Sequence, residues 1–237
     1  MVRSSPLPKL QDQLDAITAR TRMLVQPDRL AISEGVAADL LATGIEDRIL
    51  RVGSPAPEFT LQGAQSGNLP GKSVHSTDLI ALGPVIVKFF RGRWDPYCVT
   101  ELENWRELYP RVRERGVLLV AISPQTRRQN DFAAQQHGFT FPLLSDPGAV
   151  VAAQFGIAHT LPDHVRKYFR SILVNVPFAN SGLTYETADD SASEPGRITD
   201  VDVDDVHLVY RIILGLTLAL SHAVEPVGSE PSPELLA

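Results

Sequence analysis

Short apolar runs alternate along the chain with segments whose apolar residues recur every three or four positions. Runs rich in β-branched and aromatic residues predict buried strands at 84–90, 117–123 and 141–146. Segments with helical spacing or glycine stops follow them at 96–115, 131–138 and 149–156. This order predicts parallel strands with right-handed crossovers, and hence a three-layer α/β/α sandwich.

Two more helices are predicted before this domain, at 8–24 and 27–43. The first carries an apolar stripe of Leu10, Leu14, Ile17 and Thr21, and the second starts at a proline and stops before Gly44. Such stripes indicate packing against the domain or a dimer seam. We therefore expect an N-terminal helical extension over residues 1–50.

The remaining segments are less regular. A proline-containing strand is expected within 52–61, a loop at 62–73 and a helix at 161–171. Beyond residue 176 the pattern predicts a polar loop at 179–197 and one or two strands at 198–214. We expect the α/β domain to cover 51–227 and a disordered tail to cover 228–237.

Composition narrows the function classes. The 237 residues are 43% hydrophobic and 21% charged, which is ordinary globular usage. No apolar run reaches the ~20 residues of a membrane span, and the first residues lack the apolar core of a secretory signal. The net charge of −6 argues against a nucleic-acid partner. A single cysteine excludes an internal disulfide and is typical of a reducing compartment, so we expect a cytoplasmic protein.

No metal or cofactor site is expected. The aspartates at 200–205 resemble a calcium loop, but they lack its glycine at position six and its glutamate at position twelve. A strand with one solvent-exposed face explains the alternation of these aspartates with valine more simply. The six histidines show no ligand spacing, and no phosphate-binding glycine loop is present.

The candidate chemistry centres on Cys98. The predicted strand at 84–90 runs through a glycine-containing turn into a helix that Asp95 caps and Pro96 begins. Cys98 then falls in the first turn, where the helix dipole and the nearby Arg91 and Arg93 favour a thiolate. The Asp95 carboxylate opposes ionisation. The alternatives are that Cys98 is inert packing and that Asp95 is only a cap.

The chain resembles the AhpC/TSA peroxiredoxin-like branch of the thioredoxin superfamily over roughly residues 8–178. Five motifs carry this resemblance in order: VGSPAPEFTL, PVIVKFFRGRWDPYCVTEL, VAISPQ, FPLLSDP and FGIAHTLPDHVRKYF. It implies a thioredoxin-like, peroxiredoxin-type fold and thiol-peroxidase chemistry. By this resemblance Cys98 matches the peroxidatic cysteine, which becomes a sulfenic acid, and Glu101 matches an acidic residue of the same helix.

The chain departs from the family at two places. Asp95 stands where typical peroxiredoxins carry threonine and this branch carries a first cysteine, so a working enzyme needs an external thiol reductant. Near the C-terminus, the nearest match to the family's closing proline and strand is the segment 194–200. There Pro195 would be a cis-proline facing the cysteine and Arg197 the thiolate-stabilising arginine; the alternative is a plain surface loop.

Three functions follow as hypotheses. The first is reduction of a hydroperoxide by one cysteine, with Cys98, Asp95, Glu101 and Arg197 as catalytic residues. Its substrate pocket would be formed by Arg91, Arg93, Trp94, Pro96, Tyr97 and Pro195. The second is a non-redox enzyme in which Asp95 is an acid or base toward a small organic substrate. The third is a redox-inactive binding protein, and the resemblance leaves a homodimer open.

Overall fold

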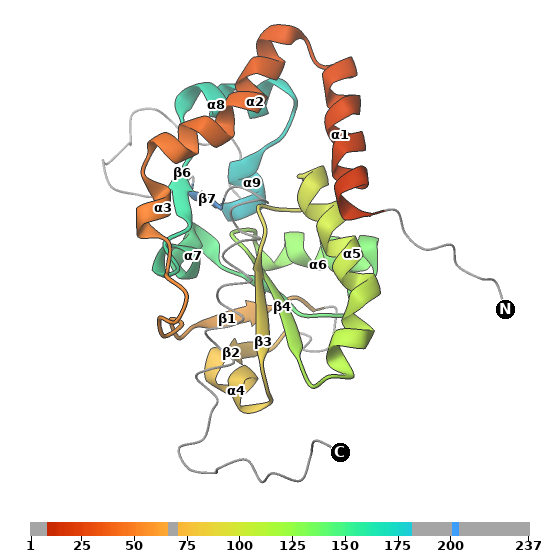
Figure 1. Ribbon diagram of the computed structural model, residues 1–237, viewed down its shortest axis with the longest axis vertical. Coiled ribbons are helices and arrows are strands. Elements are labelled where there is room, and N and C mark those ends of the chain that lie inside the picture. The colour runs from red at the N-terminus through yellow and green to blue at the C-terminus, as the bar shows by residue number, and fades with distance from the viewer. Residues whose placement is uncertain (1–8, 66–70, 182–200, 204–237) are drawn as a thin grey trace, which may run out of the picture.

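The computed structural model describes residues 9–65, 71–181 and 201–203. Its first elements are α1 (Leu10–Leu24), α2 (Pro27–Ala42) and the short α3 (Ile45–Arg48). Figure 1 shows α1 and α2 as a helical hairpin at the top of the view, with α1 beside α5 and α2 beside α8. The two long N-terminal helices lie where the sequence predicts them.

A five-stranded mixed sheet forms the centre of the fold. Its strands are β1 (Thr60–Gly63), β2 (Ser73–His75), β3 (Val85–Phe89), β4 (Leu118–Ser123) and β5 (Leu143–Ser145), in the order β2-β1-β5-β4-β3. The parallel pairing of β3 with β4 and of β4 with β5 is confirmed. β1 runs antiparallel to both of its neighbours, β2 and β5.

Helices connect and flank these strands: α4 (Ser76–Ala81), α5 (Pro96–Arg113), α6 (Arg127–His137), α7 (Val150–Gln154), α8 (Asp163–Ser171) and α9 (Val176–Ser181). A 3₁₀ turn, Pro147–Ala149, precedes α7. α6 begins at residue 127 rather than 131, because the hydroxyl of Thr126 accepts a hydrogen bond from the Gln129 amide and caps the helix there. β2 and α4 were not predicted.

A second, two-stranded sheet pairs β6 (Ala158–Thr160) with β7 (Val201–Val203) in antiparallel fashion. β7 lies inside the predicted strand region 198–214, and the rest of that region is outside the described residues. The boundaries predicted at residues 50 and 227 stay predictions.

Two hydrophobic cores hold the described elements together. The larger one joins the five-stranded sheet to its helices and contains Phe89, Cys98 and Leu102. The smaller one joins α8 to the hairpin through α2 and receives Trp94 from the turn before α5. The second core therefore fixes the N-terminal hairpin beside the cysteine-bearing turn. No helix in the described part of the chain is long and apolar enough to cross a membrane.

Candidate functional site

The turn between β3 and α5 positions the cysteine. A Cβ atom at Gly92 would lie 2.5 Å from Nε1 of Trp94, so only glycine lets that indole fold back over the turn. Asp95 is the N-cap of α5: its carboxylate accepts hydrogen bonds from the amides of Tyr97 at 3.2 Å and Cys98 at 3.1 Å. Pro96 begins the helix, and Cys98 follows in its first turn, as predicted.

The Asp95 carboxylate also holds Arg91. Nη2 and Nε of Arg91 lie 3.0 and 3.2 Å from Oδ2 of Asp95, which is 2% exposed. The guanidinium carbon of Arg91 in turn lies 5.4 Å from the centre of the Trp94 ring. Helix amides and one guanidinium thus engage both oxygens of Asp95. This geometry supports a positioning role for Asp95 more than one as an acid or base.

The Cys98 thiol is buried, with 3% of the residue exposed. Burial raises the pKa of this thiol well above its ordinary value, and the negative charge of Asp95 raises it further. The positive charges of Arg91 and Lys88 lower the pKa, but burial and Asp95 together outweigh them. The expectation that the helix start favours a thiolate is therefore wrong for this conformation, because the sulfur is removed from water.

A buried ion pair lies beneath the cysteine. Nζ of Lys88 on β3 is 2.6 Å from Oε1 of Glu101, and each side chain is 1% exposed. Glu101 follows Cys98 by one helical turn on the same buried face of α5. Lys88 was missed as a site residue because it stands inside an apolar run. A lysine in such a run requires a buried partner of opposite charge, and this requirement could have identified Lys88 from the sequence.

Arg93 contacts α6 and the segment just before it. Its backbone amide donates to Oε1 of Gln125 at 3.0 Å, and its Nε donates to Oε1 of Gln129 at 2.7 Å. Its guanidinium lies 5.7 Å from the ring of Phe132 on α6. These contacts fasten the turn to α6, and sequence reasoning missed both glutamines.

A cavity of about 570 Å³ lies between α1, α2, α8 and the start of α5. Five of the predicted site residues line it: Arg91, Trp94, Asp95, Pro96 and Tyr97. Neither Cys98 nor Arg93 is among its lining residues. Pro195 and Arg197 lie outside the described residues, so their predicted roles stay predictions.

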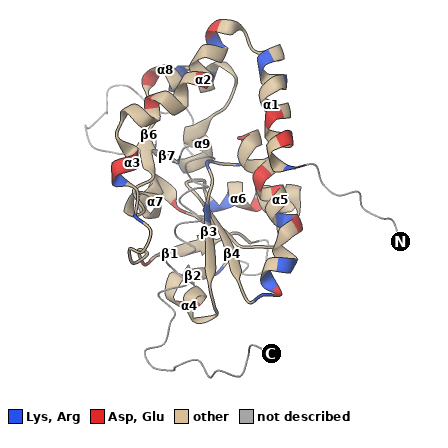
Figure 2. Cartoon of the chain, viewed as in Figure 1, with Lys and Arg blue, Asp and Glu red and all other residues tan. Residues whose placement is uncertain are grey.

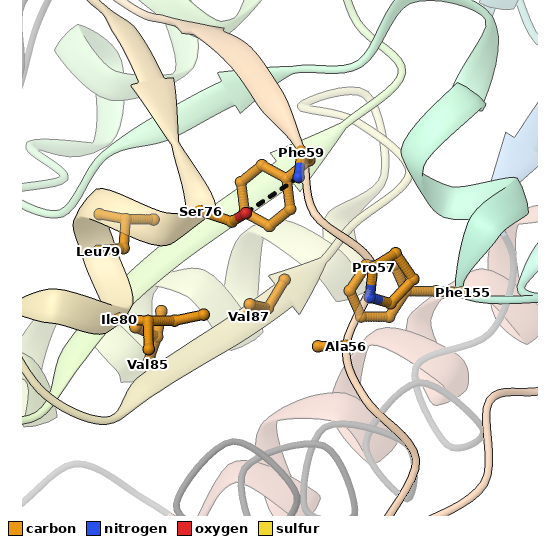
Figure 3. Close-up of a pocket in the computed structure, with 9 residues that line it drawn as sticks. All are labelled: Ala56, Pro57, Phe59, Ser76, Leu79, Ile80, Val85, Val87 and Phe155. Atoms are coloured by element: carbon orange, nitrogen blue, oxygen red, sulfur yellow. Dashed lines mark hydrogen bonds between the residues drawn. The ribbon is translucent and has the colours of Figure 1, made fainter. Parts of the chain in front are cut away.

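A second cavity lies at the far end of the sheet, between β3, α4 and the segment before β1 (Figure 3). Its volume is about 10 Å³, which is the size of one water molecule. The amide of Phe59 donates to Oγ of Ser76 at its wall. This cavity cannot hold an organic ligand. Within the described ranges, no three His, Cys, Asp or Glu side chains are grouped to hold a metal ion.

The mixed sheet and the cysteine in the first turn of the helix after β3 define a thioredoxin-like protein of the thiol oxidoreductase and peroxidase class. More specifically, the chain belongs to the AhpC/TSA family, whose model matches residues 52–174, more than half of its length. The fold class predicted from the sequence, an α/β thioredoxin-like fold of peroxiredoxin type with a leading helical extension, is confirmed.

Individual proteins that resemble this chain share low sequence identity with it or match it over a short stretch. The thiol-disulfide oxidoreductase ResA of Bacillus thuringiensis (strain Al Hakam) is 28% identical over 144 residues, which are 58% of this chain and 78% of ResA. A Mycobacterium tuberculosis protein described as a peroxiredoxin is 35% identical over 83 residues, 35% of this chain and 54% of its own. The crystal structure of peroxidoxin BcpB from the same species superposes with a TM-score of 0.44 at 29% identity, covering 47% of this chain and 70% of that one.

Proposed function

We propose that this protein is a thiol peroxidase that reduces a hydroperoxide through the single cysteine Cys98. The observation that carries the proposal is the position of Cys98 in the first turn of α5. There the positive charges of Arg91 and Lys88 lower the pKa of the thiol, against the larger upward effects of burial and of Asp95. Membership of the AhpC/TSA family supports the same chemistry. We expect the protein to act in the cytoplasm.

The reacting group is the thiolate form of Cys98. The ionised sulfur attacks one oxygen of the hydroperoxide and the O–O bond breaks, so that a sulfenic acid forms on Cys98. The leaving alkoxide or hydroxide takes up a proton and departs as an alcohol or water. Sulfur loses two electrons and the peroxide gains them. Lys88 and Arg91 stabilise the anionic sulfur that this step requires.

Regeneration needs thiols from outside the chain, because the sequence contains one cysteine. A first reductant thiol condenses with the sulfenic acid to give a mixed disulfide and water. A second thiol attacks that disulfide, releases the Cys98 thiol and leaves an oxidised reductant. The similarity to a protein named as a thiol-disulfide oxidoreductase supports an exchange of this kind.

The other predicted residues receive positioning roles in this proposal. Asp95 caps α5 and holds Arg91, and Glu101 holds Lys88 beneath the sulfur. From the family resemblance, we keep Pro195 and Arg197 as the proline facing the sulfur and a further arginine for the thiolate.

The test is direct oxidation of the reduced protein. Hydrogen peroxide or cumene hydroperoxide is added, the sulfenic acid is trapped with dimedone, and the adduct on Cys98 is followed by mass spectrometry. Because Cys98 is 3% exposed, the reaction requires the first turn of α5 to open to the peroxide. With that opening, we expect one adduct per chain, formed faster than on free cysteine at the same pH, and none in the Cys98→Ser variant. A rate no higher than that of free cysteine excludes the peroxidase.

A second candidate is a redox-inactive ligand-binding protein. The burial of Cys98 and the size of the neighbouring cavity favour it, because the cavity approaches Asp95 and Pro96 without reaching the thiol. A protein that resists peroxide but binds a small molecule in this cavity would belong to this second class.

A further inference from the structure

The cavity between α1, α2, α8 and the start of α5 is not explained by thiol chemistry, because Cys98 does not line it. Its volume of about 570 Å³ lies within the range of ~300–1,000 Å³ that is typical of small-molecule sites. Leu14, Thr18 and Thr21, at helical spacing along α1, form one of its walls together with the C-cap Val25. The N-terminal hairpin therefore encloses a space beside the α/β domain.

Aromatic side chains form another part of the lining. Trp94, Tyr168 and Phe169 all line the cavity. The rings of Trp94 and Phe169 lie 5.1 Å apart at 69°, and those of Tyr168 and Phe169 lie 5.6 Å apart at 53°. Aromatic rings in such tilted sets offer edges and faces to a further ring. The wall therefore favours a ligand with a ring.

The charges of the lining disfavour an anionic ligand. Two arginines face three carboxylates in the lining, so it carries no excess of positive charge. Arg22 pairs with Glu34 at 2.8 Å, and Arg91 pairs with Asp95 at 3.0 Å. The fifth group, Asp15, accepts a hydrogen bond from Gln11 at 2.8 Å. Figure 2 likewise shows that α1 and α2 each carry both acidic and basic residues. An uncharged ligand leaves these pairs intact.

One polar contact crosses the cavity wall. Oγ1 of Thr18 on α1 lies 3.0 Å from the hydroxyl of Tyr97 on α5. Oγ1 of Thr18 also donates to the Leu14 carbonyl at 3.2 Å, so the Tyr97 hydroxyl donates to Thr18. A hydroxyl can donate one hydrogen bond and accept two, so this pair can still accept a hydrogen bond from a hydroxyl or amine of a ligand. It gives the site an uncharged polar group that can orient a ligand.

We propose that the cavity between the N-terminal hairpin, α8 and the start of α5 binds an uncharged, ring-bearing organic molecule. The aromatic wall holds the ring, and the Thr18–Tyr97 pair orients its polar group. This site stands whether or not Cys98 reacts with peroxides, because the ligand is held by residues other than the cysteine.

The test compares two fluorescent probes on the full chain. N-phenyl-1-naphthylamine is uncharged, and 8-anilino-1-naphthalenesulfonate carries the same rings with a sulfonate. We expect one site per chain and binding of the uncharged probe tighter by about tenfold or more. Equal or tighter binding of the sulfonate, or no saturable binding of the uncharged probe, overturns the proposal.

Substitutions at two neighbouring alanines of α2 test whether the probe binds in this cavity. Ala37 and Ala38 are both exposed, and only Ala37 lines the cavity. We expect Ala37→Phe to weaken binding of the uncharged probe by about tenfold, because its ring occupies the site, and Ala38→Phe to leave it unchanged. Equal effects of the two variants overturn the assignment. Cys98→Ser should bind the probe normally, which separates this result from failure of the peroxidase.

Discussion

The buried Lys88–Glu101 pair offers the sharpest test of how the site is held. Its charged atoms lie 2.6 Å apart, and each side chain is 1% exposed. We compare Lys88→Met, Glu101→Leu and the double variant, because these substitutions remove the charges and largely keep the apolar volume. Either single variant leaves one charge buried without its partner. The double variant leaves neither charge.

The expected magnitudes follow from burial. Removing one partner of a buried pair costs about 3–5 kcal/mol. That is a large share of the ~5–15 kcal/mol by which domains are stable. Replacing both partners with apolar groups is often neutral, so we expect the double variant to lose less stability than either single variant. The double-mutant cycle should therefore give a coupling of at least about 2 kcal/mol.

Urea unfolding followed by tryptophan fluorescence measures these free energies. The control is Lys167→Met on α8, where the lysine is exposed and a change within ~0.5 kcal/mol is expected. Iodoacetamide alkylation across pH adds a functional readout. Lys88→Met should raise the pKa of Cys98, because the Lys88 charge lowers it. Additive single losses, or a Lys88→Met loss no larger than that of the control, would refute the reasoning.

Three further outcomes are expected. Asp95→Asn keeps a good cap but removes the charge that raises the pKa of Cys98, so alkylation at pH 7 should accelerate by about tenfold or more; an unchanged rate contradicts this. Burial holds the pKa of Cys98 above 9.0, so the unfolded chain ionises first as pH rises. Above that pH, urea unfolding should show stability falling relative to Cys98→Ser by up to about 1.4 kcal/mol per pH unit; parallel curves contradict this. Gly156 has a φ of 76°, and a Cβ there would lie 1.9 Å from the Arg48 carbonyl oxygen. Gly156→Ala should therefore cost more than about 2 kcal/mol in thermal unfolding, whereas the unhindered Gly35→Ala in α2 should stabilise by ~0.5–1 kcal/mol.

Local patterns predicted much of the fold. The apolar run at 84–90 and the helical spacing of apolar residues at 96–115 predicted β3 and α5 closely. Strand burial and helix periodicity both depend on residues that are close in the sequence. The cap at Asp95 and the first-turn position of Cys98 were predicted for the same reason. β2 was not predicted, since three residues in a polar segment carry no periodic signal.

The parts of the site that depend on distant segments were not predicted. The contacts of Arg93 depend on glutamines in and before α6, more than thirty residues away. The cavity depends on α1, α2 and α8 meeting the start of α5, and the apolar stripe of α1 alone could not show what faces it. The ionisation of Cys98 depends on burial by the whole core, which no local motif encodes.

The magnitudes explain why the helix start does not make Cys98 a thiolate in this conformation. A helix N-terminus favours a nearby negative charge by ~0.3–1 kcal/mol at exposed positions and ~2 kcal/mol in the best buried ones. Burying an anion costs several kcal/mol. Asp95 adds a second negative charge, and the same carboxylate engages Arg91. Thiol reactivity therefore depends on exposing the first turn of α5 to water or substrate. Substitutions that loosen this turn should accelerate oxidation of Cys98 more than those that add distant positive charge.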